Sequence, residues 1–169
     1  MMMLAPVRKT DRQSMIHTAQ WLFDAACECY RIYGELVTVL FIEKEGMLTV
    51  RPFAGRSEEA ARILQNAVTS NGSRVVGMAT EAWSVELDPN DNLDRWKSKY
   101  GSASNSPNRK EVLSLSLSSS SVDVNIVAKI EKNVDGSFSG FEGEPDLYVS
   151  GEGSKRCEGR FSGFFRHLN

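Results

Sequence analysis

Strict alternation of apolar and polar residues in the second half of the chain is the feature that most constrains its fold. Residues 110–117 alternate, residues 122–132 do the same, and a serine-rich turn joins them. A period of two is that of a β-strand with one buried face. The apolar positions are Leu113, Leu115 and Leu117 in the first segment and Val122, Val124, Ile126, Ala128 and Ile130 in the second. The pattern predicts an antiparallel pair whose apolar face is covered by other elements.

Four other segments have the composition or spacing of strands. Residues 36–42 are apolar on both faces, which favours a central strand covered on both sides. Residues 47–53 return after a tight turn, and residues 74–87 form a long strand. Asn133-Val134-Asp135-Gly136 is a hairpin signal, so residues 137–141 are expected to add a short strand.

Two segments predict helices. The first spans about residues 11–33, because Thr10 and Gln13 match a capping box and Gly34 suits the position after a helix end. The second opens with Ser57 as its N-cap. Since the strands are joined mostly by hairpin-length connections, the order favours an α+β domain. We expect a mainly antiparallel sheet of about five or six strands with two helices packed on it.

The chain divides by composition into a domain and a tail. Residues 1–142 are expected to form a single α+β domain, in which 88–108 is a long loop. Residues 143–169 read as a Gly/Ser-rich C-terminal tail with an aromatic end. This end is expected to dock on the domain through Phe161, Phe164 and Phe165.

Composition excludes several classes of protein. With 20 Lys and Arg against 22 Asp and Glu, the chain is not a strongly basic nucleic-acid coater. No apolar run suits a membrane span or a signal peptide, and the three cysteines lack disulfide or zinc spacing, so we expect a cytoplasmic protein. The two histidines, His17 and His167, have no ligand partner at metal spacing. We therefore expect no metal site, and no motif for a cofactor is present.

One strand carries a carboxylate where apolar residues are expected. Glu81 shares a face with Trp83 in an otherwise apolar run, and Arg109, Lys110 and Glu111 begin a later strand that could pair beside it. A functional interpretation is a small polar pocket with Glu81 as acid/base, Trp83 as a wall and Arg109 as an anion clamp. The other interpretation is a structural salt bridge at a sheet edge, formed by Glu81 with Arg109 or Lys110.

The long loop carries a second candidate. Residues 95–100 interleave basic residues with Trp96 and Tyr100, a composition that suits base stacking and phosphate contact. Acidic residues just before this segment and the slightly acidic chain make nucleic-acid binding the less favoured interpretation. The alternative is a mobile loop whose aromatic residues fold back on the domain.

The residues around the carboxylate also carry a resemblance. Thr80-Glu81-Ala82-Trp83, followed after a loop by Ser106-Pro107-Asn108-Arg109-Lys110-Glu111-Val112, resembles a loose group of bacterial and phage-borne proteins. The resemblance covers roughly residues 74–130. It implies a bacterial or phage origin and no particular activity. It points to the positions Glu81, Trp83, Arg109 and Glu111.

These observations lead to three hypotheses of function. The first is a small binding or assembly protein that acts through a macromolecular partner or as a homo-oligomer, because no catalytic constellation is present. The alternative is a small hydrolase or ligand-binding enzyme built on Glu81, Trp83 and Arg109. The third is weak single-stranded nucleic-acid binding through residues 95–100.

Overall fold

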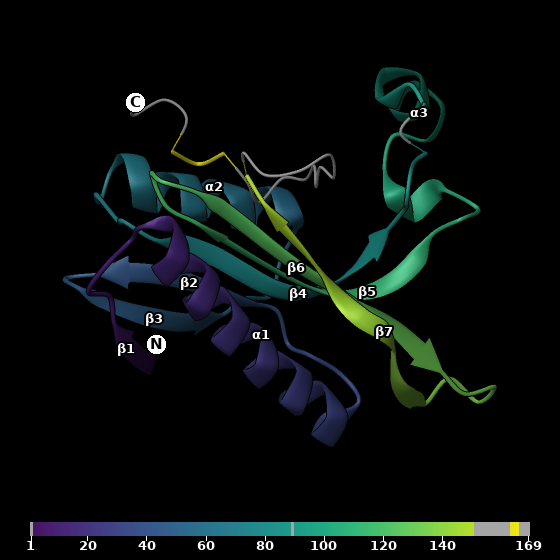
Figure 1. Cartoon of the computed structure of the whole chain (residues 1–169), viewed down its shortest axis with the longest axis horizontal. Helices are drawn as coiled ribbons and strands as arrows, with labels where there is room; N and C mark the ends of the chain where they lie inside the picture. Colours follow the sequence, from purple (N-terminus) through teal and green to yellow (C-terminus); the bar gives the residue numbers. More distant parts are fainter. Residues whose placement is uncertain (1, 89, 151–162, 166–169) are drawn as a thin grey trace.

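A computed structural model describes residues 2–88, 90–150 and 163–165 and contains one antiparallel sheet (Figure 1). The sheet has seven strands in the order β1-β3-β2-β4-β5-β6-β7. Its strands are β1 (Met2–Pro6), β2 (Val39–Lys44), β3 (Met47–Pro52), β4 (Val76–Ser84), β5 (Lys110–Ser118), β6 (Asp123–Lys132) and β7 (Phe138–Val149). The helices are α1 (Arg12–Tyr33), α2 (Ser57–Thr69), α3 (Leu93–Tyr100) and the short 3₁₀ helix η1 (Ala103–Asn105).

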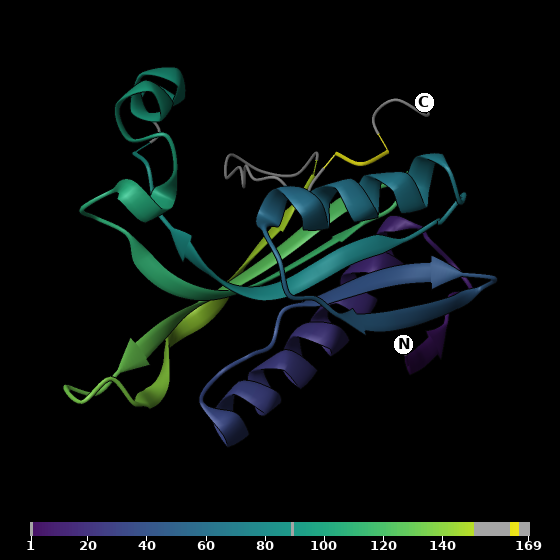
Figure 2. The ribbon, with the colours of Figure 1, turned by 180° about the vertical axis from the view of Figure 1, so that it is seen from behind.

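The two long helices cover opposite faces of this sheet. Figure 2 shows α2 on one side of the central strands and α1 on the other. The expected α+β class is confirmed, with seven strands and three α-helices among the described residues. Strand β1 was not predicted, because five residues ending in a proline carry too weak a local pattern. Backbone pairing with β3 makes this segment a strand, although its own sequence pattern does not predict one.

The caps of the helices differ in part from those predicted. Asp11, and not Thr10, caps α1: its carboxylate accepts the Ser14 backbone amide at 3.1 Å and the Ser14 hydroxyl at 2.8 Å. The backbone of Asp11 is extended (φ −65°, ψ 165°) and the helix begins at Arg12, so Asp11 occupies the N-cap position and its side chain reaches the amide three residues on. Gly34 closes the helix as expected, with φ of 71° and its amide donating to Tyr30. Ser57 is the first residue of α2 and not its cap, which is Arg56 without a side-chain hydrogen bond.

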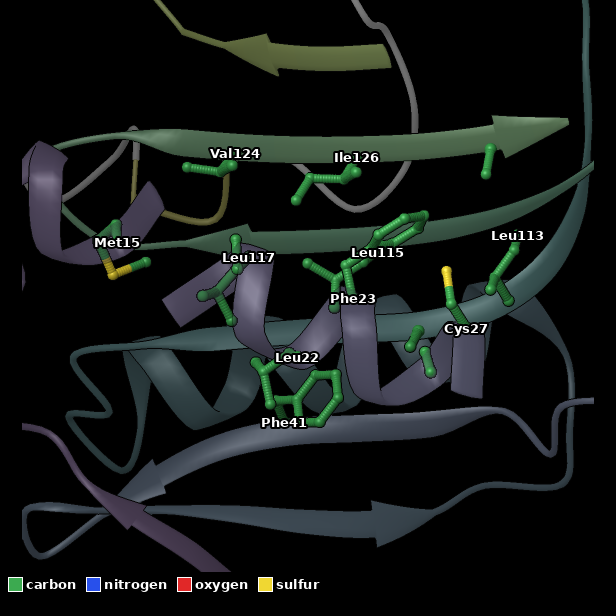
Figure 3. Close-up of a cluster of buried hydrophobic side chains, with 14 of the residues drawn as sticks. Met15, Leu22, Phe23, Cys27, Phe41, Leu113, Leu115, Leu117, Val124 and Ile126 are labelled. Carbon is green, nitrogen blue, oxygen red and sulfur yellow. The ribbon is translucent and has the colours of Figure 1, made fainter. Parts of the chain in front are cut away.

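The larger core lies between α1 and the sheet. Figure 3 shows the α1 side chains Met15, Leu22, Phe23 and Cys27 lying over the central strands. Their partners on the sheet are Phe41, Leu113, Leu115, Leu117, Val124 and Ile126. The predicted apolar faces of the two alternating strands are therefore the faces that α1 buries. Burial also raises the pKa of the Cys27 thiol to about 11, which suits a core residue.

A second core lies between α2 and the face of the sheet that is opposite the α1 face. Leu64 and Val68 of α2 are buried with Val76 of β4, and Phe164 and Phe165 are buried in the same cluster. The Gln65 side chain donates to the Phe164 carbonyl at 3.0 Å. Two of the three tail phenylalanines thus pack on the domain. The third, Phe161, lies outside the described residues.

The last strand is longer than expected. Residues 143–149, expected in the tail, continue β7 to Val149. Val149 pairs with Val124 and Leu147 with Ile126, so β6 supplies partners for the whole segment. The glycines and acidic residues had hidden this strand because they are rare in strands with a buried face.

The expected long loop contains two helices. Within residues 88–108, α3 and η1 stand on an arm that extends away from the body of the sheet (Figure 1). None of the helices in the described ranges combines the length and apolar character needed to cross a bilayer.

Candidate functional site

The sheet divides into two arms at one end, and we call this place the fork. Pairing of β5 with β6 begins at Val112 opposite Lys129. Pairing of β4 with β5 continues outward to Ser84 opposite Lys110, and the β6–β7 hairpin also runs on. The two strand pairs separate beyond this point, and α3 lies at the tip of the β4–β5 arm (Figure 1).

The register places the predicted site residues on one face. In β4, Glu81 pairs with Leu113 and Trp83 with Glu111. Directly opposed residues in an antiparallel pair share a face. Because Ala79 belongs to the α1 core, Glu81, Trp83 and Glu111 all lie on the α1 face of the sheet. The face assignment made from the sequence is therefore correct.

Trp83 and Arg109 form a stacked pair. The Arg109 guanidinium lies 5.0 Å from the centre of the Trp83 ring, and its Nη1 donates to the Ser106 carbonyl at 3.3 Å. Trp83 is 46% exposed, and Arg109 is exposed as well. A cation over an aromatic face contributes about 0.5–1 kcal/mol at exposed sites. Arg109 therefore lies against Trp83 and forms no salt bridge with Glu81.

Glu111 is neutralised across the fork. The Lys132 ammonium lies 2.8 Å from the Glu111 carboxylate, so the ion pair joins β5 to β6 where their backbone pairing has stopped. Both side chains are partly exposed. Such pairs contribute little to stability, about 0–1 kcal/mol. The ion pair of Glu111 with Lys132 thus links the two arms.

Glu81 faces a buried phenol from α1. The Tyr30 side chain is fully buried, and its hydroxyl forms no hydrogen bond of good distance and angle in the described part of the chain. Burial, followed by the nearby Glu81 carboxylate, raises the pKa of Tyr30 well above its ordinary value. The Tyr30 ring also meets the Phe138 ring edge-on, with the centroids 4.8 Å apart. These contacts bring the end of α1 to both arms of the fork.

Trp96 and Tyr100 are not part of this cluster. Both lie on α3, where their rings are 5.4 Å apart, and the Lys99 ammonium lies 5.1 Å from the Tyr100 ring. Each ring is half-buried, so the two fold on one another. The structure therefore separates the two groups of residues that the sequence analysis had selected.

The enzyme hypothesis expected a concave site around Trp83. A cavity of about 420 Å³ lies at a different place, between β1 and the first half of α1. Across the described ranges, no three His, Cys, Asp or Glu side chains are close enough together to hold a metal ion.

Sequence reasoning missed two residues of the cluster. Tyr30 was counted only as one position of the apolar stripe of the helix, and Lys132 was not considered. A signal for Tyr30 was present, since a hydroxyl on a buried stripe needs a polar neighbour. Lys132 carries no such signal, because its pairing with Glu111 depends on how β5 and β6 separate.

We refer to Glu81, Trp83, Arg109, Glu111 and Lys132 together as the fork surface. Neither a family model nor a curated protein nor a solved structure matches this chain. The function therefore has to be inferred from the fork surface itself.

Proposed function

We propose that the protein works by binding, and that the fork surface joins two copies of the chain into a two-fold dimer. One observation carries the proposal. Glu81 and Arg109 share a face with Trp83 between them, and within the described ranges neither charge takes part in an ion pair. Two opposite, unpaired charges beside an exposed aromatic ring make a surface that is complementary to itself.

In a two-fold dimer, the same surface of each copy contacts the same surface of the other copy. In an isologous interface, residue i of one copy meets residue j of the other, and residue j meets residue i. Arg109 of each copy would meet Glu81 of the other, with the two Trp83 rings at the centre. Trp and Arg are enriched in the cores of protein interfaces, while charge pairs fix the register.

The end of α1 adds apolar area close to this surface. Ile32, Tyr33 and Val37 are among the most exposed large apolar side chains of the described chain, and all three lie within seven residues after Tyr30. Tyr30 contacts the β6–β7 arm through Phe138. Exposed apolar side chains of this kind are typical of contact surfaces.

The test is a charge reversal measured by sedimentation equilibrium. The wild-type chain is expected to dimerise reversibly. Glu81→Arg and Arg109→Glu each place like charges together and are expected to weaken the dimer by about tenfold or more. The double variant restores opposite charges and is expected to recover most of the affinity.

Trp96→Ala serves as the matched control, because Trp96 is an aromatic residue outside the fork surface. It should leave the dimer unchanged. A chain that stays monomeric at all concentrations overturns the proposal, as does a double variant no better than the single ones. Circular dichroism establishes that each variant is folded.

A further inference from the structure

A groove of about 420 Å³ lies far along the sheet from the fork, between the edge strand β1 and the first half of α1. This volume is within the range of small-molecule sites, roughly 300–1,000 Å³. Core residues form the floor, an aromatic side chain forms a wall and two cations stand at the rim. These residues are Met15, Leu48, Val75, Trp21, Arg8 and Lys9.

The path of the chain creates the groove. After β1, residues 7–9 cross from the sheet edge to the start of α1 (Figure 1). The Val7 amide donates to the Gly46 carbonyl at 2.7 Å, and the Val7 carbonyl accepts Arg74 Nη2 at 2.9 Å. These two hydrogen bonds hold the connection on the sheet. The groove is therefore formed before any ligand arrives, which limits the entropy cost of binding.

The groove is apolar at its base. Met15, Leu48 and Val75 belong to the α1 core, and Val75 lies at the start of β4. Trp21 is 52% exposed and lies outside the buried stripe of α1. An exposed tryptophan beside an apolar floor offers a flat surface to the body of a ligand.

Two cations, Arg8 and Lys9, line the groove. Across the described ranges, neither Arg8 nor Lys9 forms an ion pair. Hydrogen bonds from Ser14, and to a smaller extent the charge of Lys9, lower the pKa of the Asp11 carboxyl. Asp11 accepts the Ser14 amide and hydroxyl, and Glu43 accepts the Arg74 side chain. Two cations that form no ion pair among the described residues, beside an apolar groove, are complementary to an amphipathic anion.

We propose that this groove binds a small amphipathic carboxylate. Its apolar body lies on the floor against Trp21, and its carboxylate lies between Arg8 and Lys9. Arginine can hold a carboxylate through two parallel hydrogen bonds, and lysine adds a point charge. The proposal is independent of the dimer, because the groove and the fork surface share no residue.

The experiment is a titration with decanoate, followed by amide chemical shifts and by fluorescence. The double variant Trp83→Phe/Trp96→Phe leaves Trp21 as the only tryptophan, so its emission reports on the groove. We expect saturable binding, with shifts confined to residues 5–21 and their neighbours on β3 and β4. Decanol has the same tail without the charge and is expected to bind about tenfold more weakly.

Matched charge variants distinguish the effect of the two cations at the groove from the effect of the overall charge of the chain. Arg8→Ala/Lys9→Ala is expected to weaken decanoate binding by about tenfold and to leave decanol binding unchanged. Arg56→Ala/Arg62→Ala removes two exposed cations, one at the N-cap of α2 and one within α2, which lies on the other face, and should change neither.

Several results would overturn the proposal. They include no saturable binding, equal binding in Arg8→Ala/Lys9→Ala, and shifts that map to the fork. A peptide of alternating Glu and Leu that binds the groove more tightly than decanoate would indicate a protein partner. Shifts of the same residues with protein concentration alone would indicate a second copy of the chain.

Discussion

Two glutamates at different places in the sheet have opposite environments. Glu43 of β2 is 4% exposed, and its carboxylate accepts the Gly46 amide at 3.0 Å, the Arg74 amide at 3.0 Å and the Arg74 Nε at 3.3 Å. Glu81 of β4 is partly exposed and has no ion pair within the described chain. The Tyr30 phenol of α1 lies near it and forms no hydrogen bond of good distance and angle in the described chain.

The difference between these environments indicates that Glu43 stabilises the fold and that Glu81 is available to bind a partner. A buried charge is retained only when hydrogen bonds replace its water, so the partners of Glu43 serve the fold. The turn after Glu43 also stabilises this buried charge. Glu45 and Gly46 both adopt positive φ, which brings the Gly46 amide to the Glu43 carboxylate. A charge that remains hydrated and unpaired costs the fold little and stays available to a partner. Glu81 meets that description.

The largest expected effect comes from removing the Glu43 network. Glu43→Ala leaves two backbone amides and a guanidinium without their acceptor, and we expect a loss of about 3 kcal/mol in the free energy of unfolding. Urea denaturation measures it. Glu81→Ala is the matched control and should cost less than about 0.5 kcal/mol. Equal losses at the two positions would contradict the comparison.

Protonation of Glu43 should also make the stability of the fold depend on pH. Burial alone would raise the pKa of Glu43, but hydrogen bonds from the Arg74 and Gly46 amides and from the Arg74 side chain outweigh it and lower the pKa below 4.5. A carboxyl whose folded pKa is depressed stabilises the fold above its unfolded pKa. This stabilisation is lost as the pH falls through the folded value.

Each unit of depression corresponds to about 1.4 kcal/mol. Denaturation between pH 6 and pH 2, in about one-unit steps, should show a steeper loss for the wild-type chain than for Glu43→Gln. Parallel curves would mean that the depressed pKa of Glu43 does not contribute to stability.

A smaller effect is expected from the phenol beside Glu81. Tyr30→Phe removes a buried hydroxyl that has no hydrogen bond, and keeps the ring that packs on Phe138. The variant should be as stable as the wild-type chain or more stable, by up to about 1 kcal/mol. Thermal unfolding measures the change. A clear loss would mean that the hydroxyl does donate to Glu81, and that this end of the sheet is also built for stability.

The smallest effect on folding is expected at the centre of the fork surface. Trp83→Ala removes an exposed ring that stacks on Arg109, so the free energy of unfolding should change by only about 0.5 kcal/mol. Self-association should nevertheless weaken markedly. A large loss of stability together with unchanged association would mean that Trp83 stabilises the fold and does not take part in the dimer contact.

Much of the site could be predicted from residue spacing. The alternation in β4 and β5 correctly put Glu81 and Trp83 on one face, and the proximity of Arg109 followed from its place at the start of the next strand. The stacking of Arg109 on Trp83, the ion pair of Glu111 with Lys132 and the approach of Tyr30 were not predictable. These contacts depend on the angle at which the arms separate and on where α1 crosses the sheet.

Local patterns in the sequence determined the stripe of α1, its end at Gly34, the faces of β4, β5 and β6 and the α+β class. Periodicity and caps act over a few residues, so they can be seen without the rest of the chain. Tertiary structure alone decided the pairing of β1, the extension of β7 and the hydrogen bonds that join Glu43 to Arg74, 31 residues apart. The physical reason is that backbone pairing in a sheet and compensation of a buried charge both need partners from distant segments. Such partners meet only when the whole sheet has formed.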